Sequence, residues 1–436
     1  MFNPVSEPSF RLDVAGLPDA FEVLAFTGRE AISEPFVFDL ELLIDDPVLD
    51  LASLLYRPAS LHFGPAASPV HGQLHELVQR EHASGPRLCQ VRLGPRLACL
   101  DQRFSQRIFS ARSVPQIIDQ VLKEHGIVGK DRRLELSGDY PPQDFCTQYR
   151  ESDLQFLQRL CAQERLHYHF EHRARGHCVV FGDDQQRFPT GEPAVFRSEG
   201  GRPAVRQFER QRSAVTAVQC ADCRTDLESL RSGRLMPLSG HPVTECNRLW
   251  LLTRVEHWGS QDTYHNQARA LQWPAPLEPP CAMVKPQMHS LQRAWVVEVA
   301  EAGAAPTRPV PVQFDWLYQG EGATPSHCWL PLAGPLLAET FLPLQAGTEL
   351  VVSFVEGDPD RPQITGVLHV PATIEVTATD TPGDLCSHDE GLEQWLRSAE
   401  PLLMLCLLPG GGSFNHCAQA LCTCRLATQL GQSAGA

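Results

Sequence analysis

The sequence predicts a mainly β protein with some α, an α+β fold. Short segments of alternating polar and apolar side chains recur along its 436 residues, and 36 prolines and 31 glycines supply turns between them. Such alternation is typical of strands with one buried face. Two segments instead carry apolar side chains at helical spacing behind a capping pattern, which indicates helices. At this length we expect two to four domains, at roughly 150 residues each.

The alternation is clearest in PFVFDLEL, residues 35–42. Asp39 and Glu41 lie on one face of the expected strand, and the other face carries Phe36, Phe38, Leu40 and Leu42. One face is therefore expected to be buried and the other to contact water. Strand patterns fill residues 10–100, interrupted by a short helix that we expect to end at Pro58.

The two predicted helices share one design. Ser113 with Gln116, and Ser152 with Gln155, are each a serine followed three residues later by a glutamine, the pattern of a capping box. Gly126 stands where a C-terminal cap belongs. The expected buried stripes are Val114, Ile117, Ile118, Val121 and Leu122 in the first helix, and Leu154, Leu157, Leu160 and Cys161 in the second.

A histidine-rich strand, LHYHF, is predicted directly after the second helix. On a strand His167 and His169 share a face, and a third ligand from a neighbouring strand would complete a zinc site. Tyr168 and Phe170 carry the opposite, apolar face, so we expect both histidines to be solvent-exposed, with His172 pointing the other way or lying in the turn. Without a closed ligand set, the spacing favours ordinary structure over a metal centre.

The cysteines indicate synthesis in a reducing cytosol. There are fifteen, without regular spacing, and the N-terminal MFNPVSEPSF lacks the features of a Sec signal peptide. Cys220 and Cys223 form a C-x-x-C without the βαβ context of a redox motif or the second pair of a zinc ribbon. The apolar run at 401–408 is far shorter than the roughly 20 residues of a membrane span.

The net charge excludes some partners. A formal charge of −15 argues against nucleic acid and anionic membrane surfaces, because both require a basic face. Motifs for a metalloprotease, a serine hydrolase nucleophile or a phosphate-binding loop are absent from the sequence. We therefore expect no enzyme activity, no catalytic residue, no metal and no cofactor.

A second β domain is predicted at residues 289–370, behind a proline-rich linker at 276–288. Its five strand candidates are residues 293–300, 309–316, 327–333, 349–355 and 362–369. The turn before the last strand resembles a calcium loop only superficially, because further oxygen ligands and a terminal glutamate are missing. We expect a tight turn in which prolines fix φ and aspartates cap backbone N–H groups.

Structural roles are predicted for ten residues of this domain. Gly366 is expected to let its strand lie close to a neighbouring strand. Trp316 and Trp329 are expected to be the largest apolar anchors of the barrel. The ten residues with predicted structural roles are those of the turn, Glu356, Gly357, Asp358, Pro359, Asp360, Arg361 and Pro362, together with Gly366, Trp316 and Trp329.

Five segments, in order along the chain, resemble the VgrG family, the spike proteins of bacterial type VI secretion. QYRESDLQFLQRL and EGDPDRPQITG are highly specific phrases within them. The resemblance covers residues 10–208 and 232–370. The segments are GLPDAFEVLAFTGREAISEPFVFDLELL (16–43), RIFSARSVPQIIDQVLKEHGI (107–127), YPPQDFCTQYRESDLQFLQRLCAQERLHYHFEH (140–172), LSGHPVTECNRLWLLTRVEHWG (238–259) and FVEGDPDRPQITGVLH (354–369).

The resemblance implies phage-hub-like barrel domains followed by an OB-type β-barrel, in a homotrimer carried on a hexameric tube. The expected partners are the tube protein and an effector or adaptor. Export on this tube needs no Sec signal. The implied organisation is a first hub barrel domain (1–100), a hub α+β segment (101–208), a shortened second hub barrel portion (209–275), a linker (276–288), an OB-type barrel (289–370) and an irregular tail without the β-helical needle (371–436).

The sequence departs from the family in two places. The segment between Phe208 and Arg231 is much shorter than in family members, so the second hub barrel is expected to be reduced. No needle pattern follows Val370, so a PAAR-type tip, which binds at the needle end, is not counted among the expected partners. The alternatives are a zinc-dependent hydrolase using His167 and His169, an effector-bearing protein, a phage-derived tail hub, and a non-functional truncated copy.

Overall fold

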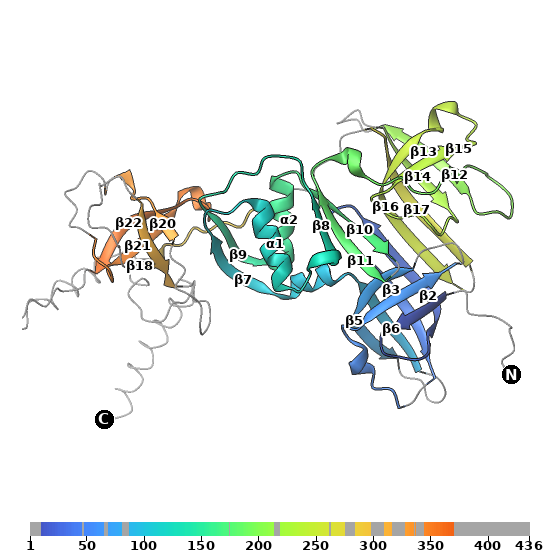
Figure 1. The fold of residues 1–436 in the computed structure, drawn as a ribbon, viewed down its shortest axis with the longest axis horizontal. Coiled ribbons are helices and arrows are strands. Elements are labelled where there is room, and N and C mark those ends of the chain that lie inside the picture. The colour runs from blue at the N-terminus through green and yellow to red at the C-terminus, as the bar shows by residue number, and fades with distance from the viewer. Residues whose placement is uncertain are drawn as a thin grey trace, which may run out of the picture. The chain divides into compact units, whose positions relative to one another are not determined.

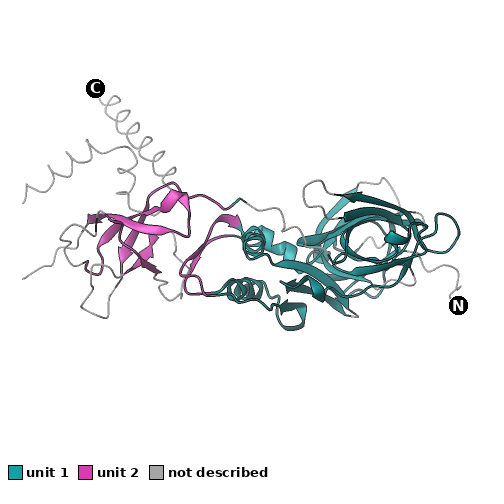
Figure 2. Ribbon diagram, turned by 90° about the horizontal axis from the view of Figure 1, so that it is seen from above, with its two compact units in different colours: residues 1–104, 113–141, 152–284 teal, residues 105–112, 142–151, 285–436 magenta. Residues whose placement is uncertain are grey.

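The computed structural model describes residues 10–369 apart from short gaps. The gaps are 46–47, 65–68, 81–86, 174, 213–218, 261–262, 275–283, 298–308, 316–327, 335 and 337–343. The chain divides into two compact units, each interrupted in sequence (Figure 2). Unit 1 comprises residues 1–104, 113–141 and 152–284, and unit 2 comprises 105–112, 142–151 and 285–436. The expectation for the tail at 371–436 lies outside the described residues.

Unit 1 begins with a closed ring of six antiparallel strands (Figure 1). The strand order is β1-β4-β5-β6-β3-β2, and β2 pairs back onto β1 to close the ring. The expected short helix is a single 3-10 turn, Leu51–Leu54, capped by Asp50. The strands are β1 (Phe10–Val14), β2 (Phe21–Ala31), β3 (Glu34–Ile44), β4 (Pro58–Phe63), β5 (Val70–Arg80) and β6 (Arg87–Gly94).

A second six-stranded ring follows in the same unit. Its path runs β12-β15-β16-β17-β14-β13, and a bridge between Phe196 and Val205 closes it. Two of its strands begin before residue 209, and the ring is closed although the segment between Phe208 and Arg231 is short. The strands are β12 (Ala194–Val195), β13 (Val205–Arg212), β14 (Gln219–Thr225), β15 (Leu235–Ser239), β16 (Leu249–Ser260) and β17 (Thr263–Gln272).

The two rings share one continuous sheet because β16 also pairs with β2. Arg254 lies opposite Ala31 at one end of this antiparallel pairing, and Ser260 opposite Ala25 at the other. The twelve strands of both rings are therefore hydrogen-bonded together. The inner face of the second ring is apolar and includes Phe208, Trp250 and Leu252.

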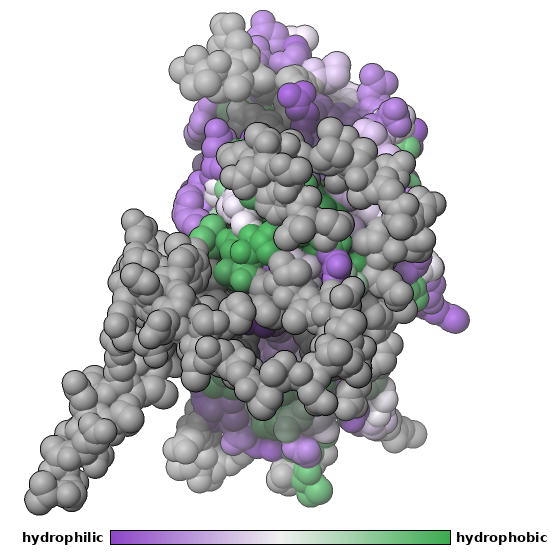
Figure 3. Space-filling view, turned by 90° about the vertical axis from the view of Figure 1, so that its left-hand side faces the viewer, coloured by the Kyte–Doolittle hydropathy of each residue, from purple (hydrophilic) through white to green (hydrophobic). Residues whose placement is uncertain are grey.

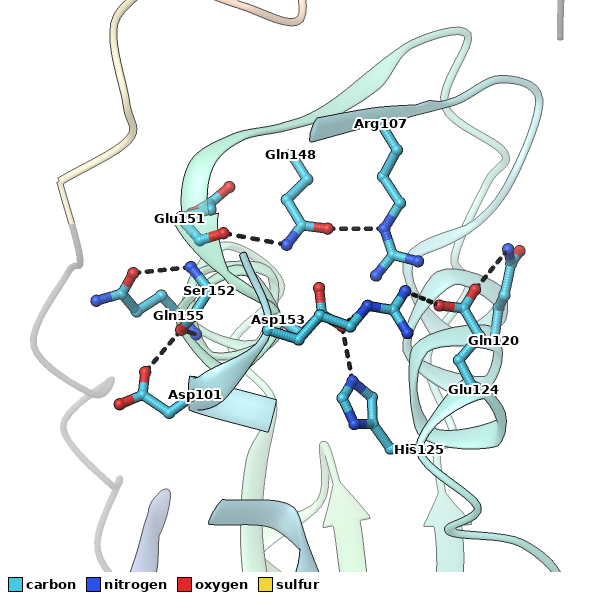
Figure 4. A network of polar contacts seen from close by, with 11 residues as sticks. Asp101, Arg107, Gln120, Glu124, His125, Gln148, Glu151, Ser152, Asp153 and Gln155 are labelled. Carbon is cyan, nitrogen blue, oxygen red and sulfur yellow. Dashed lines mark hydrogen bonds and ion pairs between the residues drawn. The ribbon is translucent and has the colours of Figure 1, made fainter. Parts of the chain in front are cut away.

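Between the rings along the chain lie two helices and a small sheet. The helices are α1 (Val114–Glu124) and α2 (Asp153–Gln163), and the sheet contains β10 (His167–Arg173), β11 (Gly176–Gly182) and β8 (Arg132–Glu135). Both predicted capping boxes are present, and every residue of both predicted stripes is buried. In α2 the Ser152 Oγ accepts from the Gln155 N–H at 3.1 Å (Figure 4).

The helix ends are also set by local sequence. Gly126 has φ +69°, and the Ile127 N–H donates to the Leu122 carbonyl at 2.9 Å, a Schellman cap. At the start of α2, Asp153 is fully buried and accepts from His125 Nε2 at 2.7 Å (Figure 4). A carboxylate in the first turn also interacts favourably with the helix dipole.

Unit 2 contains the second predicted β domain as an OB-type barrel. Its strands are ordered β20-β19-β18-β21-β22, and a parallel bridge between Leu332 and Ile364 closes the ring. The strands β7 (Phe104–Phe109) and β9 (Cys146–Ser152) pair with each other, and Tyr149 of β9 joins the barrel core. The barrel strands are β18 (Gln292–Val296), β19 (Val310–Phe314), β20 (Cys328–Leu330), β21 (Glu349–Phe354) and β22 (Pro362–His369).

Two glycines make room for phenylalanine rings of the neighbouring strand: Gly28 of β2 for Phe38 of β3, and Gly259 of β16 for Phe26 of β2. A Cβ on Gly28 would lie 2.2 Å from the Phe38 ring, and a Cβ on Gly259 would lie 2.1 Å from the Phe26 ring. Both distances are impossible without displacing the ring. Glycine is therefore required at these positions by packing, because each ring folds over the backbone of the neighbouring strand.

We expect Gly28→Ala and Gly259→Ala each to lower the free energy of unfolding of unit 1 by about 1–3 kcal/mol, the usual range for overpacking. Urea denaturation followed by tryptophan fluorescence measures the change. Gly201→Ala is the control, because a Cβ there meets nothing within 4 Å. Equal midpoints for all three variants would show that the rings can shift at little cost.

Candidate functional site: the 356–362 turn of unit 2

The 356–362 turn joins β21 to β22 and has an unusual backbone. Glu356 and Gly357 both have positive φ, at 58° and 74°. A Cβ on Gly357 would lie 2.7 Å from the His289 ring, so only glycine fits there. The Asp358 Oδ1 accepts from the Asp360 N–H at 2.9 Å, which confirms the prediction of a tight turn capped by an aspartate.

Lys285 forms ion pairs with both aspartates of this turn. Its Nζ lies 2.5 Å from Asp358 Oδ1 and 2.6 Å from Asp360 Oδ2, and its side chain is 29% exposed. Burial disfavours the charged lysine, but the two carboxylates outweigh it and raise the Lys285 pKa. Burial likewise acts to raise the pKa of Asp358, and the hydrogen bond from Lys285 is among the contacts that bring it below its ordinary value. The sequence signal for this lysine is weak, because it stands about seventy residues before the turn.

The same turn also holds β9. The Thr147 N–H donates to Asp360 Oδ1 at 2.5 Å, and the Thr147 hydroxyl donates to the Pro359 carbonyl at 2.8 Å. On the other side the Met288 N–H donates to the Gly357 carbonyl at 2.7 Å. Three segments far apart in sequence therefore meet at the 356–362 turn, and their polar groups satisfy one another.

The structure does not support the roles predicted for the other residues of the barrel. Trp329 was expected to be an apolar anchor, and this is wrong: its side chain is 54% exposed, while its neighbours Cys328 and Leu330 are buried. A Cβ on Gly366 would lie 3.7 Å from Val351, an ordinary contact that gives no steric reason for glycine. Trp316 lies outside the described residues. The Arg361 side chain makes an exposed ion pair with Glu356 at 4.0 Å, and its charge also acts to lower the Asp358 pKa.

The expectation that His167 and His169 are solvent-exposed is also wrong. Their residues are 8% and 4% exposed, because Phe188 covers both rings, with centroids 4.6 and 5.3 Å away. Burial lowers the pKa of each to about 4. His172 lies on the opposite face of β10 and packs against Phe36 at 5.2 Å. Among the described residues, no three histidine, cysteine or acidic side chains are placed to hold a metal ion.

The C-x-x-C cysteines have separate partners. Cys223 donates to the Ala268 carbonyl in the core of the second ring, and Cys220 donates to the Gln211 carbonyl. Both are free thiols. Their positions fit ordinary strand packing.

Sequence reasoning missed a buried polar network inside unit 1. Glu30 of β2 is 4% exposed and lies 3.7 Å from Arg231 and 3.4 Å from His257 of β16. Burial alone would raise the Glu30 pKa, but the close contact with His257 and the Arg231 charge lower it to about 2. His257 Nδ1 lies 2.7 Å from the Tyr264 hydroxyl, which accepts from Asn266. The sequence feature that could have revealed this network is Glu30, a charged residue on the same face of β2 as the buried Phe26 and Gly28.

Comparisons with known proteins agree with this fold. The family model of the phage tail baseplate hub (GPD) matches residues 29–221. The type VI secretion system spike proteins VgrG4b and VgrG5 of Pseudomonas aeruginosa are 34% and 35% identical, over 87% and 85% of this chain. The chain is a homologue of the VgrG spike proteins. It spans 59% and 58% of the length of these two relatives.

A solved structure shows the same fold. The E. coli c3393 protein, a component of the type VI secretion system with structural similarity to the T4 bacteriophage tail proteins gp27 and gp5, has a TM-score of 0.70 at 24% identity. The match covers 82% of this VgrG homologue and 99% of that chain. The expected fold, hub barrels followed by an OB-type barrel, is thus confirmed. No helix in the described part of the homologue is long and apolar enough to cross a membrane.

We expect Lys285→Met to lower the stability of unit 2 by about 1–3 kcal/mol at pH 7, because it leaves two aspartates without their cation. The Asp358 pKa is depressed on folding, so its contribution is present above about pH 4 and is lost as the pH falls further. Urea unfolding at pH 7 and pH 3 measures both effects. Arg112→Met, at an exposed arginine of the same unit, is the control; a difference between Lys285→Met and wild type that persists unchanged at pH 3 would contradict the electrostatic explanation.

Unit 1 should lose stability on acidification. In the unfolded chain His169 takes up a proton near pH 6.5, whereas in the folded chain its pKa is about 4. The stability contribution of the neutral His169 is therefore fully present above pH 6.5 and decreases as the pH falls from 6.5 to about 4. We expect His169→Phe to reduce the loss between pH 7 and pH 5 by about 1–2 kcal/mol. Thermal or urea unfolding at both pH values measures it, with the exposed His265→Phe as control. An unchanged slope in His169→Phe would contradict the assignment.

Proposed function

We propose that the chain forms the hub and OB-type barrel at the base of a type VI secretion spike, and that its role is mechanical and non-enzymatic. The observation that carries the proposal is the pair of closed six-stranded rings joined in one twelve-stranded sheet, in a homologue of spike proteins. In a closed barrel every strand is hydrogen-bonded to a neighbour on both sides, so no strand edge is left open. Such a ring suits a mechanical role.

The proposed assembly is a homotrimer. Three chains with two rings each would present six barrels, which suits the hexameric tube implied by the family resemblance. The proposed partners are the tube protein and an effector or adaptor. The proposed route is synthesis in the cytoplasm and export by the assembled machine.

Exposed apolar side chains support contact between subunits. Among the described residues, Phe104 is 67% exposed, Trp329 54% and Val284 90%. Figure 3 shows apolar residues gathered in one area of the face it draws. Exposed apolar surface of this kind is common where one protein contacts another.

A phage-derived tail hub is the second candidate, and the match of residues 29–221 to the phage baseplate hub family favours it. The fold and the trimer would be the same. The carrying tube distinguishes the two functions: co-purification with the tube protein of a secretion locus supports the first, and with a phage tail protein the second.

Light scattering behind a sizing column tests the proposed trimer. The chain has a mass of 48.4 kDa, so a trimer is expected at about 145 kDa, three times that value. A mass that stays near that of one chain at high protein concentration would contradict the homotrimer.

A further inference from the structure

Cys99 is the one partly exposed thiol among the nine cysteines that the structure describes; the other eight are buried. It lies in the 3-10 turn Arg96–Gln102 (η2) of unit 1. Leu97 and Leu100 of this turn are buried, and the turn packs against α2 and β5. The thiol is therefore held in place by the packing of its neighbours.

A histidine in contact with this thiol is fixed in one tautomer. His75 of β5 lies with Nε2 3.1 Å from the Pro95 carbonyl and Nδ1 3.7 Å from Cys99 Sγ. A carbonyl can only accept, so Nε2 carries the proton and Nδ1 is left unprotonated. Nδ1 is therefore the acceptor for the Cys99 S–H. A nucleophile, its base and a group that orients the base are thus present together.

A third side chain stabilises the thiolate. The Gln73 Nε2 donates to Cys99 Sγ at 2.9 Å, and Gln73 is 8% exposed. The positive charge of nearby Arg96 also favours the anion. At rest the pair is neutral, because burial raises the pKa of the Cys99 thiol and lowers that of His75. The ionic form is therefore a minor tautomer, reached by moving one proton over a contact that already exists.

We propose that Cys99 is a modification site that forms a mixed disulfide with small-molecule disulfides, with His75 as its general base. The Cys99 proton moves to His75 Nδ1, and the thiolate attacks one sulfur of the disulfide. The disulfide bond breaks, and the leaving thiolate takes the proton from His75. One disulfide is consumed and one formed, so no further oxidant is required. A free thiol leaves.

Peptide mapping of the full chain after timed exposure to hydroxyethyl disulfide measures the rate at Cys99 itself. We expect His75→Asn to react at least about tenfold more slowly at pH 7, since asparagine can accept the S–H but is not a base. His62→Gln is the matched control, a partly exposed histidine of the same ring that is paired with Asp13 at 2.7 Å. Cys99→Ser verifies the modified peptide.

The pH profile of the unaltered chain is an independent test that no folding defect can confuse. Proton transfer within the pair gives a rate that is nearly constant between pH 6.5 and pH 8. An isolated thiol would instead lose about tenfold in rate for each pH unit below its pKa. A tenfold fall per unit in the unaltered chain, or equal rates in wild type and His75→Asn, would overturn the proposal.

Discussion

The pairing of β2 with β16 is the constraint on which unit 1 depends. Each strand belongs to a different ring, and their hydrogen bonds turn two barrels into one sheet. A one-residue slip would turn every side chain of β2 to the opposite face. Gly259 makes such a slip costly, because the Phe26 ring of β2 lies over it, and Gly28 accommodates the Phe38 ring of β3 in the same way.

The buried polar network reinforces this register. Glu30 lies in β2, His257 in β16, and Arg231 in the connection that precedes β15. An unpaired buried charge is expensive, whereas a paired one is tolerated. The two rings must therefore come together correctly for Glu30 to find its partners. Arg231 also lies 5.0 Å from the Phe63 ring centroid, which ties the same charge to the first ring.

The sequence predicted what is encoded locally. Capping boxes at Ser113 and Ser152 and the five strands of the OB-type barrel depend on neighbours within a few residues, and all of them formed. Burial of His169 depends on Phe188, which arrives from a separate turn, so alternation along β10 could not reveal it. Trp329 shows the opposite error: residue size suggested an anchor, but the flanking Cys328 and Leu330 already occupy the inward face.

The charges at the 356–362 turn hold segments of unit 2 together. At the 356–362 turn, Lys285 is shared by Asp358 and Asp360, and Asp360 also accepts from Thr147. Here the polar groups hold one segment of the chain to another, so force applied to β9 or to β22 is carried by several bonds at once. The proposed mechanical role requires rigidity of that kind.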